Sequence, residues 1–192
     1  PVEYHFTSKR CHFTQRQVGR DTGTFATGLR SALRQAPDVI FVGEIRDYET
    51  ALTALQASET GHLVVSTLHS EKVADTMERY LNLFAAVDEK HGVNLLANQL
   101  SGVLCQKLVP SADGGLHLLV EHVENAGAMR DWIARRELQN IDQYLSRGSD
   151  PAAVSFLQST LKALQGKIIT EETALASVSN ESELRRAMRG IG

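Results

Sequence analysis

The chain contains 192 residues, of which 42% are hydrophobic and 22% charged, and its net charge is −3 at neutral pH. This length predicts one globular domain with an appendage, or one and a half domains, and the charge argues against a protein that coats nucleic acid through bulk positive charge. No apolar run approaches the ~20 residues that span a bilayer. The two cysteines, Cys11 and Cys105, are too few and too far apart for a disulfide framework or a zinc site, which favours a reducing cytoplasm.

The first predicted elements alternate between helix and strand. Residues 24–34 carry apolar side chains at helical spacing. The apolar runs 38–42 and 63–67 predict strands, and we expect the first to be buried on both faces of a parallel sheet. Between them, Asp47 can cap a helix over residues 50–58. Because parallel neighbours need a crossover, this order predicts an α/β domain with a parallel sheet.

Two more helices, a hairpin and a helical tail follow. Residues 72–84 and 93–104 read as helices, the second turning extended near its end. The turn at 111–115 predicts a β-hairpin that pairs 103–109 with 116–123. The rest of the chain has helical periodicity, in the segments 129–136, 138–146, 152–165, 171–178 and 181–188. We therefore expect an α/β core at residues 1–124 and a small all-helical region at 125–192.

The first predicted strand leads directly into Gly43-Glu44-Ile45-Arg46-Asp47. In open parallel sheets, ligands bind beyond the carboxyl ends of the strands, so we expect Glu44 and Arg46 at the rim that meets a substrate. A carboxylate there can act as a general base toward water or organise a water on bound Mg²⁺. The alternative is a solvated turn with a helix cap, which we prefer for Asp47, whereas a functional role is preferred for Glu44.

The second predicted strand delivers Leu68-His69-Ser70 to the same rim. A histidine beside a polyanion can donate a hydrogen bond to one of its oxygens. Most loop histidines have no such role, and His69 is singled out because its strand follows the Glu44 strand along the chain. The phosphate-binding pattern Gly-x-x-x-x-Gly-Lys-Ser/Thr is absent from the sequence. These residues therefore look like half of a nucleotide site.

Three stretches resemble the secretion and pilus traffic ATPases, the PilT/GspE-like superfamily. The run from Gly19-Arg20-Asp21-Thr22 to Gly43-Glu44-Ile45-Arg46-Asp47 resembles the family's atypical Walker B region. Residues 60–70, which contain His69, resemble its histidine box, and Pro1-Val2-Glu3-Tyr4 resembles the tail of its acidic box. Residues 128–135 and the ending of the chain are similar to the type IV pilus retraction branch.

The resemblance implies the C-terminal half of a RecA-like P-loop NTPase core that uses ATP and Mg²⁺. It implies that Glu44 is the catalytic carboxylate that orients water and that His69 approaches the terminal phosphate. Glu3 would support Mg²⁺ through water, and Arg46 would tie the Walker B turn to its surroundings. The protein would be a hexameric ring motor that moves a membrane-embedded assembly.

The same resemblance implies a set of partners and a location. The partners would be sister subunits of a homohexamer, an inner-membrane platform, and cytoplasmic components of a pilus or secretion machine. The protein would be cytoplasmic and peripherally associated with the inner membrane, and no direct binding of nucleic acid is expected.

Two alternatives to a pilus retraction motor stay open. One is a conjugative or effector-delivering type IV secretion ATPase, and the other is a non-catalytic module that docks onto a secretion ATPase ring or its membrane platform. Because the chain begins at Pro1 and lacks a phosphate loop, we expect a longer protein whose upstream part holds that loop. These residues alone are expected to be inactive.

Overall fold

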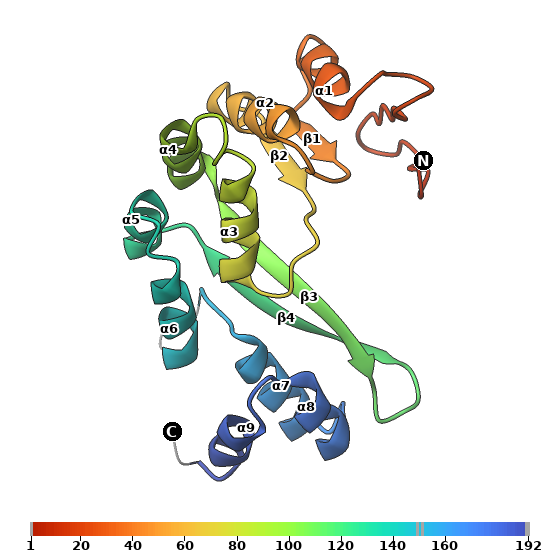
Figure 1. The fold of residues 1–192 in the computed structure, drawn as a ribbon. Helices are drawn as coiled ribbons and strands as arrows, with labels where there is room; N and C mark the ends of the chain where they lie inside the picture. Colours follow the sequence, from red (N-terminus) through yellow and green to blue (C-terminus); the bar gives the residue numbers. More distant parts are fainter. Residues whose placement is uncertain (1, 149, 151, 191–192) are drawn as a thin grey trace. The chain divides into compact units, whose positions relative to one another are not determined.

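The chain folds as two units, and the computed structural model describes residues 2–148, 150 and 152–190. The first unit holds the chain up to Leu68 together with Leu83–Gly92. The second unit holds His69–Asn82 and the chain from Val93 onward. Figure 1 labels the helices and strands of both units.

The first unit is built on two parallel strands. Strand β1 (Val39–Val42) pairs with β2 (Leu63–Ser66), with Val39 opposite Leu63 and Val42 opposite Ser66. Helix α1 (Phe25–Leu33) contacts β1, and α2 (Tyr48–Glu59) is the crossover between the strands (Figure 1). The predicted order of helix, strand, helix and strand is therefore confirmed.

Helices α1 and α2 begin at side-chain caps. Thr24 accepts a hydrogen bond from the Thr27 amide at the start of α1. Asp47 Oδ1 accepts one from the Thr50 amide at 2.8 Å, as predicted for α2. Each cap satisfies an amide that has no partner within the helix and typically contributes about 1 kcal/mol to stability.

The prediction that the first strand is buried on both faces is wrong for the described chain. Ile40 and Val42 are buried, but Val39 is 56% exposed and Phe41 is 62% exposed. Because successive strand residues point to opposite faces, the helices that cover Ile40 and Val42 leave the Val39 face open.

The second unit is organised around an antiparallel hairpin. Strand β3 (Gly102–Pro110) pairs with β4 (Leu116–Glu124) along its whole length, which confirms the predicted hairpin. Helix α3 (Val73–Asn82) contacts both strands. Helix α4 (Glu89–Gln99) begins and ends earlier than predicted, and Gly102 already belongs to β3. Gly102 lies close to the Val123 carbonyl, where a Cβ would come within 2.8 Å of the oxygen.

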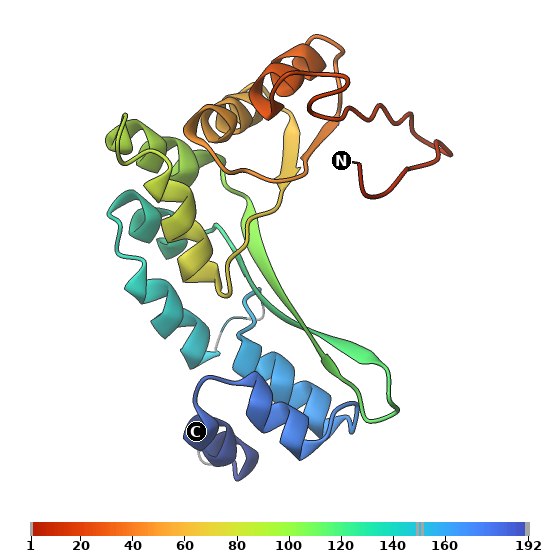
Figure 2. The same ribbon diagram turned by 45° about the vertical axis from the view of Figure 1, so that its right-hand side comes forward.

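The last three helices of the helical tail pack on this hairpin. The tail consists of α5 (Ala128–Ala134), α6 (Gln139–Arg147), α7 (Phe156–Gln165), α8 (Glu171–Ser177) and α9 (Glu181–Met188). Val109 and Leu119 of the hairpin form one core with Ala163, Ala174 and Leu184 of the last three helices. Figures 1 and 2 show these helices beside the hairpin segment that leads to its turn.

Helix α7 is shorter than predicted. The predicted helix over 152–165 begins only at Phe156, because Ser155 caps it. The domain boundary expected near Glu124 stays a prediction. Among the described residues, none of the helices combines the length and the apolar character that crossing a bilayer requires.

Candidate functional site

Three hydrogen bonds join the ends of the two parallel strands. Ser66 Oγ donates to the Val42 carbonyl at 2.8 Å, and Thr67 Oγ1 donates to the Gly43 carbonyl. The Ile45 amide donates to the Thr67 carbonyl at 3.2 Å. These bonds hold the backbone on both sides of Glu44 at the carboxyl ends of the strands, where open parallel sheets bind ligands.

The Glu44 carboxylate forms an ion pair with Arg46. Glu44 Oε2 lies 2.5 Å from Arg46 Nη2; the Glu44 side chain is 17% exposed and that of Arg46 is 70% exposed. The hydrogen bond that Arg46 donates to Glu44, and then the negative charge of Glu44, raise the pKa of Arg46 above its ordinary value. The pair leaves a carboxylate oriented at the strand end, with a charged partner that reaches solvent.

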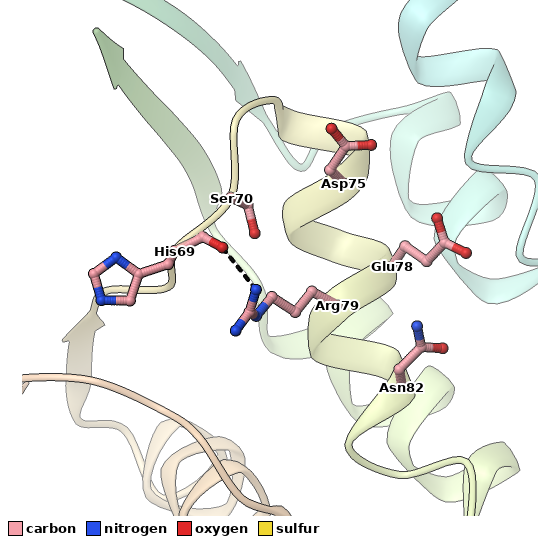
Figure 3. Close-up of a pocket in the computed structure, with 6 residues that line it drawn as sticks. All are labelled: His69, Ser70, Asp75, Glu78, Arg79 and Asn82. Carbon is pink, nitrogen blue, oxygen red and sulfur yellow. Dashed lines mark hydrogen bonds between the residues drawn. The ribbon is translucent and has the colours of Figure 1, made fainter. Parts of the chain in front are cut away.

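His69 lies in the second unit, after β2. Its carbonyl accepts a hydrogen bond from Arg79 Nη1 of α3 at 2.9 Å. Figure 3 shows the imidazole pointing away from α3. The structure thus brings Glu44 and Arg46 together, whereas the predicted approach of His69 to Glu44 stays a prediction.

A pocket of about 310 Å³ lies beside the His69 segment, lined by His69, Ser70, Asp75, Glu78, Arg79 and Asn82 (Figure 3). Ser70 Oγ is buried and has no hydrogen-bond partner among the described residues. Arg79 and the other polar residues of α3 were not among the residues predicted from the sequence. Their helical spacing of three and four residues was a usable signal, since it places them on one helix face.

Glu3 lies in the exposed segment that opens the described chain. Two hydrogen bonds hold this segment against Gln15. The Gln15 side chain accepts a hydrogen bond from the Phe6 amide and donates one to the Tyr4 carbonyl, each at 2.8 Å. The role of Glu3 near Mg²⁺ stays a prediction. Among residues 2–148, 150 and 152–190, no group of three or more His, Cys, Asp or Glu side chains is arranged to hold a metal ion.

Comparison with known proteins shows the family to which this chain belongs. The model of the type II/IV secretion system protein family matches residues 1–180. The chain belongs to this family. The recognised motifs around Glu44 and His69 both lie inside the matched region.

Similar proteins include pilus ATPases. The chain is 37% identical over 175 residues to the type IV pilus retraction ATPase PilT of Pseudomonas aeruginosa, covering 91% of this chain and 51% of that protein. It is 41% identical over 159 residues to YggR of Escherichia coli, covering 83% of this chain and 49% of YggR. The chain therefore spans about half the length of the curated relatives it matches.

Solved structures share the fold. The pilus retraction motor PilT with bound ADP matches with a TM-score of 0.85 and 38% identity, over 97% of this chain and 52% of that one. The ATPase DotB of Legionella pneumophila matches with a TM-score of 0.74 and 31% identity, over 82% of this chain and 42% of that one. The predicted fold class, an α/β core of a P-loop ATPase with a hairpin and a helical region, is confirmed.

Proposed function

We propose that the protein is a subunit of an ATP-hydrolysing ring motor that drives a type IV pilus or a related type II/IV secretion system. The observation that carries the proposal is the Glu44 carboxylate, held at the carboxyl end of two parallel strands and paired with Arg46. The similarity to pilus ATPases, one of which was solved with ADP bound, supports a nucleotide as the ligand of this strand end.

In this proposal each residue has a distinct role. The Glu44 carboxylate orients a water molecule and accepts its proton, because a fixed carboxylate can do both. Arg46 is a positioning residue that keeps one Glu44 oxygen in place. The His69 imidazole donates a hydrogen bond to the terminal phosphate of the nucleotide, where negative charge has to be stabilised.

The residues present fit a Mg²⁺–nucleotide complex in part. Carboxylate oxygens and waters are the ligands that Mg²⁺ prefers in proteins, and bound Mg²⁺ supplies charge that neutralises the phosphates. Glu44 is a partly exposed carboxylate at the strand end, and the exposed Glu3 would support the ion through water. The sequence lacks the phosphate loop motif, so we expect these residues alone not to hydrolyse ATP.

The proposed partners follow from the family. We expect six copies in a ring that works on an inner-membrane platform from its cytoplasmic side, together with cytoplasmic components of the machine. The net charge of −3 does not favour direct contact with nucleic acid.

The test is the release of phosphate from ATP by the full-length protein that contains these residues. We expect turnover that requires Mg²⁺ and disappears when the ion is chelated, and no turnover by the 192-residue chain alone. A full-length protein that binds a secretion platform but does not hydrolyse ATP would contradict the proposal and favour the non-catalytic module.

A further inference from the structure

Glu121 is a buried carboxylate in β4 that the proposed mechanism does not use. It is 6% exposed. Its Oε1 accepts a hydrogen bond from the Val73 amide at 3.0 Å, and its Oε2 accepts one from the Phe156 amide at 3.3 Å. Val73 is the first residue of α3 and Phe156 the first residue of α7, so one carboxylate binds the amino ends of two helices.

These two bonds have a clear physical basis. The first amides of a helix have no partner within the helix, and the amino end carries partial positive charge. A carboxylate there forms charge-assisted hydrogen bonds, which are stronger than neutral ones. Ser155 already satisfies the Gln158 amide of α7, so Glu121 serves a different amide of the same turn. The carboxylate therefore fixes the starts of α3 and α7 to the hairpin.

Helix α3 has a second connection, which leads to His69. Arg79, in the last turns of α3, donates from Nη1 to the His69 carbonyl at 2.9 Å (Figure 3). Glu121 fixes the first residue of this helix, and Arg79 of the same helix holds the backbone of His69. Both bonds lie within the second unit.

We propose that Glu121 is a positioning residue that couples the His69 segment to the helical tail through α3. A change in the position of α7 is then transmitted to α3 by the shared carboxylate and to His69 by Arg79. The proposal rests on the proposed role of His69 at the terminal phosphate. It gives the tail, which packs on the hairpin around Leu119, a route to the rate of hydrolysis.

The shared carboxylate can be tested with Glu121→Gln. The amide keeps the shape of the side chain, but its NH₂ group cannot accept a hydrogen bond, so one helix amide loses its partner. Glu124→Gln is the matched control, because Glu124 lies at the exposed end of the same strand. We expect hydrogen exchange at Val73 or Phe156 of the full-length protein to accelerate roughly tenfold in Glu121→Gln. Unchanged exchange at both amides would overturn the Glu121 clamp, by which we mean the two hydrogen bonds from the Val73 and Phe156 amides to the Glu121 carboxylate.

The coupling to His69 needs a second measurement. In the full-length protein, Glu121→Gln should lower kcat roughly tenfold and leave the Kd for ATP unchanged, as expected for a displaced catalytic group. If Glu121 acts through His69, the same substitution should have no further effect on kcat in a His69→Ala background. An equal loss of kcat in both backgrounds would overturn the coupling and leave Glu121 a structural residue.

Two further results separate this proposal from the proposed function. If His69→Ala alone keeps full kcat, the role of His69 fails and the coupling fails with it, while hydrogen exchange still tests the clamp. If Glu121→Gln does not fold, Glu121→Asp replaces it, since it keeps the charge and is too short to reach both helices. It should accelerate exchange at one of the two amides, and unchanged exchange would again overturn the clamp.

Discussion

The guanidinium of Arg46 lies 2.5 Å from the carboxylate of Glu44, two residues earlier in the loop that follows β1. Both groups lie at the carboxyl end of a parallel strand pair, and the arginine is the more exposed of the two. The pair therefore orients the carboxylate while its cation stays in contact with solvent.

We predict that Arg46→Gln lowers kcat of the full-length protein roughly tenfold, a size typical of residues that orient a functional group. The melting temperature should stay unchanged, because exposed ion pairs contribute little to stability. Arg30→Gln is the control, since Arg30 forms a similar exposed pair with Glu49 at 2.7 Å. Equal kcat values for Arg46→Gln and Arg30→Gln would contradict the role of Arg46. Because the pKa of Arg46 is raised, the ion pair with Glu44 should stay intact toward alkaline pH.

The hydrogen bond between Thr67 and the Gly43 carbonyl gives a second prediction. Thr67→Val removes this bond at the carboxyl end of β2. Thr60→Val removes the bonds of a similar hydroxyl before β2 begins, which contacts the Ala57 and Gln56 carbonyls and His62 Nδ1. Each should cost about 1 kcal/mol of stability. Only Thr67→Val should also lower kcat, because it loosens the Glu44 loop. Equal kcat values in the two variants would show that the Thr67 bond is only structural.

For His69, we predict that His69→Ala lowers kcat of the full-length protein about 10²-fold, the effect typical of losing one donor to the transition state. The Arg79 contact should survive, since it uses the His69 carbonyl. His122→Ala serves as a control for losing an imidazole, because His122 lies within the hairpin strand β4. A His69→Ala rate equal to wild type would demote His69 to a structural residue.

The tail offers a prediction about pH. Tyr144 donates a hydrogen bond to Asp150, which lowers the pKa of Asp150 and raises the pKa of Tyr144 to about 12. A lowered carboxyl pKa contributes stability above the unfolded value of about 3.9, and this contribution is lost as pH falls through the folded value. The melting temperature of wild type should therefore exceed that of Tyr144→Phe at pH 7, and the gap should close on acidification below pH ~4. A gap that stays constant into acid would contradict the contribution of this bond.

Local patterns predicted much of the fold and part of the site. The two parallel strands, the hairpin and the cap at Asp47 follow from side-chain period and turn chemistry, which act over a few residues. The exposure of Phe41 could not be predicted this way, because it depends on which face the helices cover. Glu44 could be predicted from its place after a strand. The helical spacing of the α3 residues could have pointed to Arg79 as part of a polar helix face. Its contact with His69, and the contacts of Glu121, could not be predicted, since the partners lie 10 and up to 48 residues away in the sequence.

The central claim is that the Glu44 carboxylate activates water, and it is tested most directly by Glu44→Gln in the full-length protein. Glu49→Gln is the control, because it removes a carboxylate that also pairs with an arginine but lies on α2. Phosphate release and the Kd for ATP should be measured for both variants. We predict that Glu44→Gln abolishes turnover while ATP affinity stays near wild type, and that Glu49→Gln changes neither. Turnover by Glu44→Gln at the wild-type rate, or a loss of ATP affinity as large as the loss of rate, would contradict the account.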